Sequence, residues 1–210
     1  MDAGDLTLED IVDLGAYERA RDDYRRRVME RKRRRRVALG PIMTVVFESV
    51  DTVRFQVQEM ARAERIATDE GIQAELDVYN RLLPTPGELS GTLFIELVSE
   101  ADLRHWLPRL VGIERSLAIE VGDPAAGASV VPSIPEATHA GALTREAVTP
   151  AVHYLRFPFG GSAVERLAAG EPAVLAARHP AYEAATALSP ETVEDLVADL
   201  EGRTEPLPLP

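Results

Sequence analysis

The chain contains no cysteine among its 210 residues. This absence excludes disulfide bonds, thiolate-ligated zinc, cysteine-ligated iron–sulfur clusters and a cysteine nucleophile. If the protein takes part in redox biology, the electrons are therefore carried by another molecule.

Long hydrophobic runs are also missing. The longest apolar stretches, such as residues 93–98, are far too short to span a bilayer. The first thirty residues are polar and charged, unlike a secretory signal. We therefore expect a cytoplasmic protein that makes no membrane contact.

Lysine is almost absent. Lys32 is the only lysine, and it stands beside 22 arginines. Together with the abundant alanine, this ratio indicates the coding bias of a GC-rich genome. The choice of arginine over lysine therefore does not indicate that these residues bind carboxylates or phosphates through two hydrogen bonds.

Positive charge is concentrated in one segment. Residues 25–36, RRRVMERKRRRR, hold nine positive charges, although the formal net charge of the chain is −12. Residues 19–36 have a balance of +8, so the rest of the chain sums to −20. Such asymmetry can mark an interaction surface, whereas overall acidity opposes contact with polyanions.

The basic segment has three interpretations. Positive charge suits the C-terminal end of a helix, and we favour this solvated helix end. A surface that docks an acidic protein comes second. Nucleic-acid binding is the least favoured, because no aromatic residues interleave and the acidic remainder repels phosphate. The docking candidates are Arg26, Arg27, Arg33, Arg34 and Arg35.

Helical patterns dominate the first third of the chain. Tyr17, Tyr24 and Val28 lie on one apolar stripe that predicts a helix over residues 16–35. A second helix is expected over residues 52–67 with Asp51 as its N-cap. Ser189 and Pro190 predict the start of a last helix that runs to Leu200.

Strand patterns follow, the clearest at residues 151–159. This order predicts an α+β fold, with N-terminal helices followed by a largely antiparallel sheet with interspersed helices. No repeat or clean linker appears. We therefore expect one domain over residues 1–205 and a disordered, proline-rich tail at 206–210.

The segment QVQEMARAERI, residues 56–66, is the first candidate site. Glu59 and Arg62 are three residues apart and can form an ion pair. Glu64 ends an apolar row, so it must be paired or near solvent. Glu59 and Glu64 could hold a metal or supply a base, but we favour structural ion pairs.

The segment AVHYLRFPF, residues 151–159, alternates with period two. Val152, Tyr154 and Arg156 then share one face of a strand, and His153 lies on the other. A histidine among apolar neighbours is usually a satisfied core residue. Arg156 could bind an anion or cap a sheet edge.

The segment RHPAY, residues 178–182, is the third candidate. Pro180 keeps His179 from helical geometry, so a loop is expected to present its imidazole as a ligand or proton carrier. Bonding to backbone carbonyls is the favoured alternative. Tyr182 completes the ligand-binding candidates. Histidine spacing gives only a weak metal signal, although folding could bring His153 and His179 together.

Five segments resemble a bacterial family known as a domain of unknown function. They are RRRVALGPIMTVVFES, DTVRFQVQEMARAERI, LFIEL, AVHYLRF and HPAY, and the likeness runs from Leu6 to Leu200. Genes of that family often lie near those for rubrerythrin-like proteins and iron–sulfur oxidoreductases resembling heterodisulfide reductase subunits. The resemblance implies an accessory role in redox or peroxide stress and supplies no catalytic residues. Family members have a glycine-containing stretch before His-Pro, where this chain reads VLAARHPAY.

Three functions remain open. The first is a cytoplasmic accessory protein that contacts an acidic or redox partner through its basic segment. The second is an enzyme or sensor that binds a metal or small ligand through glutamate and histidine side chains. The third is nucleic-acid binding through the arginine-rich helix. No catalytic motif fixes a reaction, and no cofactor is indicated.

Overall fold

The computed structural model describes residues 4–136 and 148–210. The α-helices are α1 (Leu14–Arg34), α2 (Val50–Glu64), α3 (Asp69–Tyr79), α4 (Glu100–Trp106), α6 (Gly161–Ala168) and α7 (Pro190–Leu200). The short 3₁₀ helices are η1 (Leu8–Asp10), η2 (Asn80–Leu82), η3 (Ile113–Arg115) and η4 (Pro124–Ala126). The strands are β1 (Arg36–Ala38), β2 (Met43–Phe47), β3 (Glu88–Ile95), β4 (Leu117–Val121), β5 (Ser129–Pro132), β6 (Ile134–Pro135), β7 (Val152–Pro158), β8 (Ala173–His179) and β9 (Tyr182–Ala187).

The strands form two antiparallel sheets. Sheet A has the order β1-β2-β3-β7-β6, and sheet B has the order β5-β4-β8-β9. The α+β prediction is confirmed. The sequence pattern had suggested one sheet, whereas the strands divide between two. The RHPAY segment also differs from the loop that was predicted for it. His179 pairs with Tyr182 across a tight turn, so this segment joins two strands as a hairpin and does not form an open loop.

The two sheets enclose the main hydrophobic core. Leu155 and Phe157 of β7 are buried there with residues of sheet B such as Ile119 and Leu175. His153 lies on the same side of β7, while Tyr154 and Arg156 are only half-buried on the other side. The predicted alternation of this strand is confirmed.

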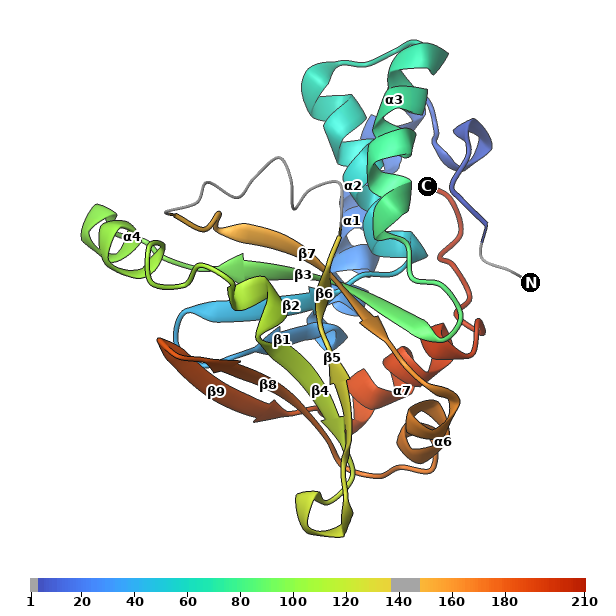
Figure 1. Ribbon diagram of the computed structural model, residues 1–210. Coiled ribbons are helices and arrows are strands. Elements are labelled where there is room, and N and C mark those ends of the chain that lie inside the picture. Colours follow the sequence, from blue (N-terminus) through green and yellow to red (C-terminus); the bar gives the residue numbers. More distant parts are fainter. Residues whose placement is uncertain (1–3, 137–147) are drawn as a thin grey trace.

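A helical layer of α1, α2 and α3 stands on the other side of sheet A, as Figure 1 shows. Val53 and Val57 of α2 pack with Leu76 of α3, and Tyr154 of β7 lies against this cluster. Sheet A therefore has an apolar face toward sheet B and a face with polar residues toward the helices.

Helix α2 begins earlier than predicted. Ser49 is its N-cap, and the Ser49 hydroxyl accepts a hydrogen bond from the backbone N–H of Thr52. Asp51 is instead a fully buried residue of the first turn. The predicted start of α7, with Ser189 as N-cap and Pro190 in the first turn, is confirmed.

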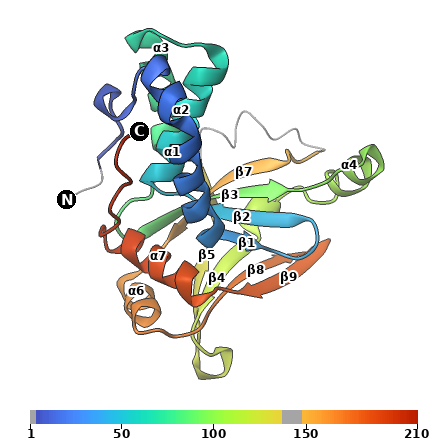
Figure 2. The same cartoon turned by 180° about the vertical axis from the view of Figure 1, so that it is seen from behind.

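The C-terminal segment passes along the helical layer, close to α1 and α2 (Figure 2). The backbone N–H of Leu207 donates to Asp51 Oδ1 at 2.8 Å, and Arg54 donates to the Leu207 carbonyl. Arg31 donates to Asp51 and to the carbonyl of Glu205. This part of the proline-rich tail has no regular secondary structure but is anchored by a buried charge cluster.

Candidate functional site

The C-terminal part of the basic segment folds back onto the protein. Arg35 is only 3% exposed and forms a two-pronged ion pair with Asp199 of α7, with Nη–Oδ distances of 2.5 and 3.1 Å. Arg34 pairs with Glu194 and Asp195 of the same helix. Arg35 is therefore a buried structural residue and not part of a docking surface.

The other docking candidates remain at the surface. Arg26 pairs with Asp23 and Arg33 pairs with Glu30 along exposed faces of α1. Arg27 is half-buried and, within the described ranges, forms no ion pair. Exposed pairs contribute little to stability, so Arg26 and Arg33 are free to exchange partners.

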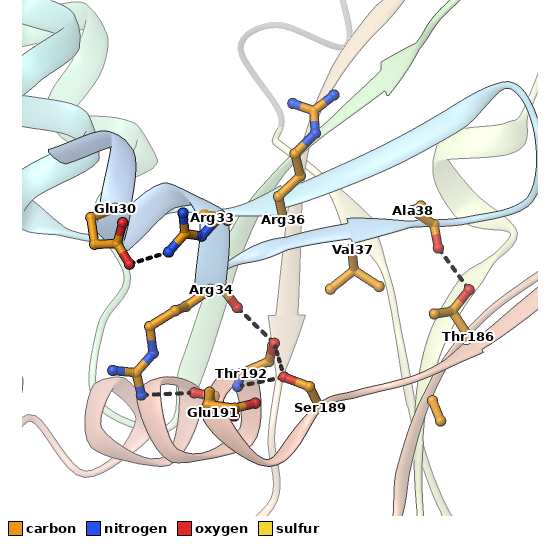
Figure 3. A pocket seen from close by; sticks show the side chains of 11 residues that line it. Glu30, Arg33, Arg34, Arg36, Val37, Ala38, Thr186, Ser189, Glu191 and Thr192 are labelled. Carbon is orange, nitrogen blue, oxygen red and sulfur yellow. Dashed lines mark hydrogen bonds and ion pairs between the residues drawn. The ribbon is translucent and has the colours of Figure 1, made fainter. Parts of the chain in front are cut away.

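A pocket of about 510 Å³ lies where α1, β1, β9 and the start of α7 meet (Figure 3). The Arg34 carbonyl accepts the Thr192 hydroxyl, and the Ala38 carbonyl accepts the Thr186 hydroxyl. Arg36 points to the opposite side of β1 from Val37. The charges that line this pocket are mixed, because Glu30 and Glu191 accompany the three arginines at 33, 34 and 36.

Glu59 is a structural carboxylate that joins α1 to α2. It accepts hydrogen bonds from the Tyr17 hydroxyl at 2.7 Å and from two nitrogens of Arg21 at 2.8 Å each. Arg62 Nε lies 3.4 Å from Glu59 Oε1, which is the ion pair that their three-residue spacing predicted. The hydrogen bonds from Arg21 lower the pKa of Glu59 to about 2. Glu64 is exposed at the end of α2 and, among the described residues, does not form the structural ion pair that we favoured for it.

His153 is a buried core residue. Its Nε2 lies 3.1 Å from the Thr149 hydroxyl, and its Nδ1 lies 4.0 Å from Glu114 Oε2. Burial lowers the pKa of His153, although Glu114 opposes this shift. Hydroxyl, imidazole and carboxylate resemble a nucleophile, a base and its orienting acid. Thr149 is only 1% exposed, however, so we assign the group to the core.

The remaining candidates also bond to the backbone. Arg156 pairs with Glu88 at 2.7 Å and donates to the Leu83 carbonyl. His179 Nε2 lies 3.1 Å from the Val111 carbonyl, and Tyr182 donates to the Leu39 carbonyl at 2.6 Å. The Tyr182 hydroxyl lies against Gly40, whose φ of +70° forms the turn before β2.

These candidates do not converge on one site. Glu59 lies between helices, His153 between the sheets, and His179 in the hairpin of sheet B. Throughout the part of the chain that the structure describes, no group of three histidine or acidic side chains could hold a metal ion. In the same residues, no helix is long and apolar enough to cross a membrane.

A different set of residues surrounds a cavity of about 210 Å³ between the helical layer and sheet A. We call it the Glu48 cavity. Its polar lining combines a carboxylate, an amine, an amide, two phenols and two hydroxyls. The residues that line it are Lys32, Glu48, Thr52, Val53, Gln56, Tyr79, Leu82, Thr92, Phe94, Val152 and Tyr154.

Local sequence places each group. Thr92 of β3 pairs with Tyr154 of β7 in the register of sheet A, so both side chains lie on the face that the helices cover. Glu48 follows directly after β2 and precedes the Ser49 cap of α2. Its carboxylate is thereby held at the junction between the sheet and the helix.

Glu48 is the central charged group of this cavity. It is 8% exposed, and its carboxylate accepts hydrogen bonds from the hydroxyls of Thr92, at 2.6 Å, and Thr52. No cation forms an ion pair with it among the described residues. The nearby Arg35 donates to the backbone carbonyl of Glu48, at 3.2 Å, and not to its carboxylate. A carboxylate has about four acceptor positions, so roughly two stay open.

The two phenols of the cavity are protonated donors. Burial raises the pKa of Tyr154, and nearby Tyr79 and Glu48 raise it further. Burial also raises the pKa of Tyr79, which its hydrogen bond with Gln56 partly opposes. Lys32 is half-buried and, in the described part of the chain, its side chain has no hydrogen bond or ion pair.

Sequence reasoning missed this cavity. One signal was present in Lys32, whose rarity we attributed to coding bias. Another was Glu48, an acidic residue at the end of the apolar run MTVVF. Neither signal indicates a shared site without the tertiary structure.

The model of a family described as "Protein of unknown function (DUF3501)" matches residues 5–200 of the chain. A crystal structure of a novel protein of unknown function from Burkholderia pseudomallei K96243 is similar, with 36% sequence identity and a TM-score of 0.84. The match covers 94% of this chain and 100% of the Burkholderia chain. No curated protein matches the sequence.

Proposed function

Because the chain belongs to the DUF3501 family of proteins of unknown function, we propose a function from its own geometry. The protein binds a small molecule that carries an ammonium or another cationic group, and Glu48 recognises that group. One observation carries the proposal: a buried carboxylate borders a cavity and has no ion-pair partner within the described residues. This is the ligand-binding alternative, with Glu48 in place of Glu59, Glu64 and the histidines.

The energetic argument rests on desolvation. A buried carboxylate loses its hydration, and buried charges in proteins are normally paired with an opposite charge. The hydroxyls of Thr52 and Thr92 restore only part of that loss. A cation in the cavity would supply the rest, so it binds most favourably where the carboxylate is least solvated.

Titration with propylammonium tests this proposal, with 1-propanol as its neutral counterpart. We expect saturable shifts of the amide NMR signals of Thr52, Thr92 and Tyr154 at millimolar propylammonium, on the order of 10 mM, and no saturation with propanol. Glu48→Gln should abolish the response, because it removes the charge and keeps the shape. Thr92→Val should weaken it.

Glu165→Gln is the matched control, because Glu165 is an exposed carboxylate on α6. This variant should respond like the unchanged protein. The proposal fails if Glu48→Gln binds propylammonium as well as the unchanged protein does. It also fails if propanol and propylammonium give the same response.

Docking of an acidic partner is the second candidate. Its support is the group of Arg26, Arg27 and Arg33, which stay at the surface in weak pairs or in none. The family resemblance suggests a redox or peroxide-stress protein as the partner, in keeping with a cytoplasmic accessory role. The fold-back of Arg34 and Arg35 makes this surface smaller than the sequence suggested.

Charge reversal tests the docking surface. Arg27→Glu combined with Arg33→Glu should reduce co-purification of a rubrerythrin-like partner at least about tenfold, because attraction becomes repulsion. The control is Glu18→Arg, which changes charge at an exposed position near the other end of α1. Equal recovery of the partner by the double variant and the control would contradict docking.

A further inference from the structure

The only lysine of the chain lines the Glu48 cavity. Lys32 lies in the last turn of α1, between arginines that pair with carboxylates of the protein. The Lys32 side chain itself has neither a hydrogen bond nor an ion pair in the described ranges. Its ammonium sits on a flexible four-carbon stem with three donors, so it can turn toward a bound group.

Glu48 and Lys32 are thus two opposite charges that border one cavity without pairing with each other. A ligand with an ammonium alone would satisfy Glu48 and add a second positive charge beside Lys32. A ligand with a carboxylate alone would face Glu48 with a like charge, which costs free energy. A ligand that carries both charges can satisfy both residues.

The remaining lining limits the size and polarity of the ligand. The cavity of about 210 Å³ equals the volume of roughly seven water molecules. Val53, Leu82 and Phe94 offer an apolar wall for a short aliphatic segment. Gln56 and the phenol of Tyr79, which are hydrogen-bonded to each other, form a polar part of the wall. A nucleotide or a large cofactor would have to extend out of the cavity.

Resting on the proposed function, we infer that the ligand of the Glu48 cavity is a small zwitterion, an amino carboxylate with a short aliphatic chain. Its ammonium binds Glu48, and its carboxylate binds Lys32. Glu48 therefore determines whether the cavity binds an amine at all, and Lys32 determines which amines the cavity prefers.

Comparison of matched probes tests the inference. The probes are glycine, β-alanine and γ-aminobutyrate as zwitterions, propylammonium as amine alone and propionate as carboxylate alone. At least one zwitterion should bind about tenfold or more tighter than propylammonium, because a hydrogen-bonded contact with a charged group is worth that factor. The best zwitterion reports the spacing between the two charges.

Lys32→Met should remove that advantage and leave propylammonium binding in place. Lys32→Arg should retain part of it. Arg25→Met is the control, since Arg25 is exposed on the same helix and its loss changes the net charge equally. Equal binding of propylammonium and every zwitterion, or an unchanged zwitterion preference in Lys32→Met, would overturn the inference and leave the proposed function standing. No saturable binding of any cationic probe would overturn both.

Discussion

Replacement of Arg35 by methionine is expected to lower the free energy of unfolding by about 3–5 kcal/mol. Arg35 and Asp199 are both buried, at 3% and 6% exposure, and they join the end of α1 to α7. Methionine keeps much of the side-chain volume but leaves the Asp199 carboxylate buried without its partner. Urea unfolding followed by circular dichroism measures the change.

Two further variants separate charge from packing. Arg35→Met with Asp199→Leu should recover a large part of the lost stability, because no uncompensated charge then remains in the interior. Arg26→Met, which breaks an exposed pair on the same helix, should change stability by less than about 1 kcal/mol. If Arg35→Met lowers the free energy of unfolding no more than Arg26→Met does, the ion pair with Asp199 does not stabilise the contact between α1 and α7 as we describe.

Asp51→Asn is expected to cost about 3 kcal/mol or more and to release the C-terminal segment. Asp51 is 0% exposed, and its carboxylate accepts from Arg31, from Arg54 and from the Leu207 backbone. Asparagine keeps the shape but removes the charge that compensates two guanidinium groups. Arg54 is itself 4% exposed and cannot turn to solvent.

Hydrogen exchange measures the second part of this prediction. The amide of Leu207 should exchange much faster in Asp51→Asn than in the unchanged protein, since its acceptor is weakened. Asp23→Asn, which breaks an exposed pair of α1, should leave the exchange of Leu207 unchanged. Equal protection of Leu207 in all three proteins would mean that the charge cluster does not hold the tail.

The architecture follows from local patterns where they are strong. The alternation of residues 152–158 and the Ser-Pro start of α7 are set by neighbours in sequence, and both predictions are confirmed. The strand β9, YEAATA, was missed because alanine has little preference for strands. It is held by its pairing with β8 and by a hydrogen bond from Thr186 to Ala38.

In the basic segment, too, the sequence predicts local contacts but not those that depend on the tertiary fold. Its exposed pairs, Arg26 with Asp23 and Arg33 with Glu30, are three residues apart and follow from helical spacing. The pair of Arg35 and Asp199 spans 164 residues, so only the tertiary fold brings it together. Much of the apparent positive charge is thereby compensated within the molecule.

The Glu48 cavity lay beyond sequence reasoning for the same reason. Its lining comes from α1, α2, α3, η2, β3 and β7 together with the residue after β2. The sequence candidates were chosen because charges were dense or a histidine stood among apolar residues. Most of those residues proved to be paired within the protein, whereas Glu48 follows an apolar strand and Lys32 lies among arginines, and neither position alone indicates a cavity.

The free energy of unfolding of Glu48→Gln, measured without ligand beside the unchanged protein, tests most directly whether Glu48 is held for binding. A carboxylate kept unpaired for a ligand does not stabilise the fold. We therefore expect Glu48→Gln to stay within about 1 kcal/mol of the unchanged protein or to be more stable. A loss of about 3 kcal/mol or more, like that expected for Arg35→Met, would show that Glu48 is a structural residue and would contradict a binding role.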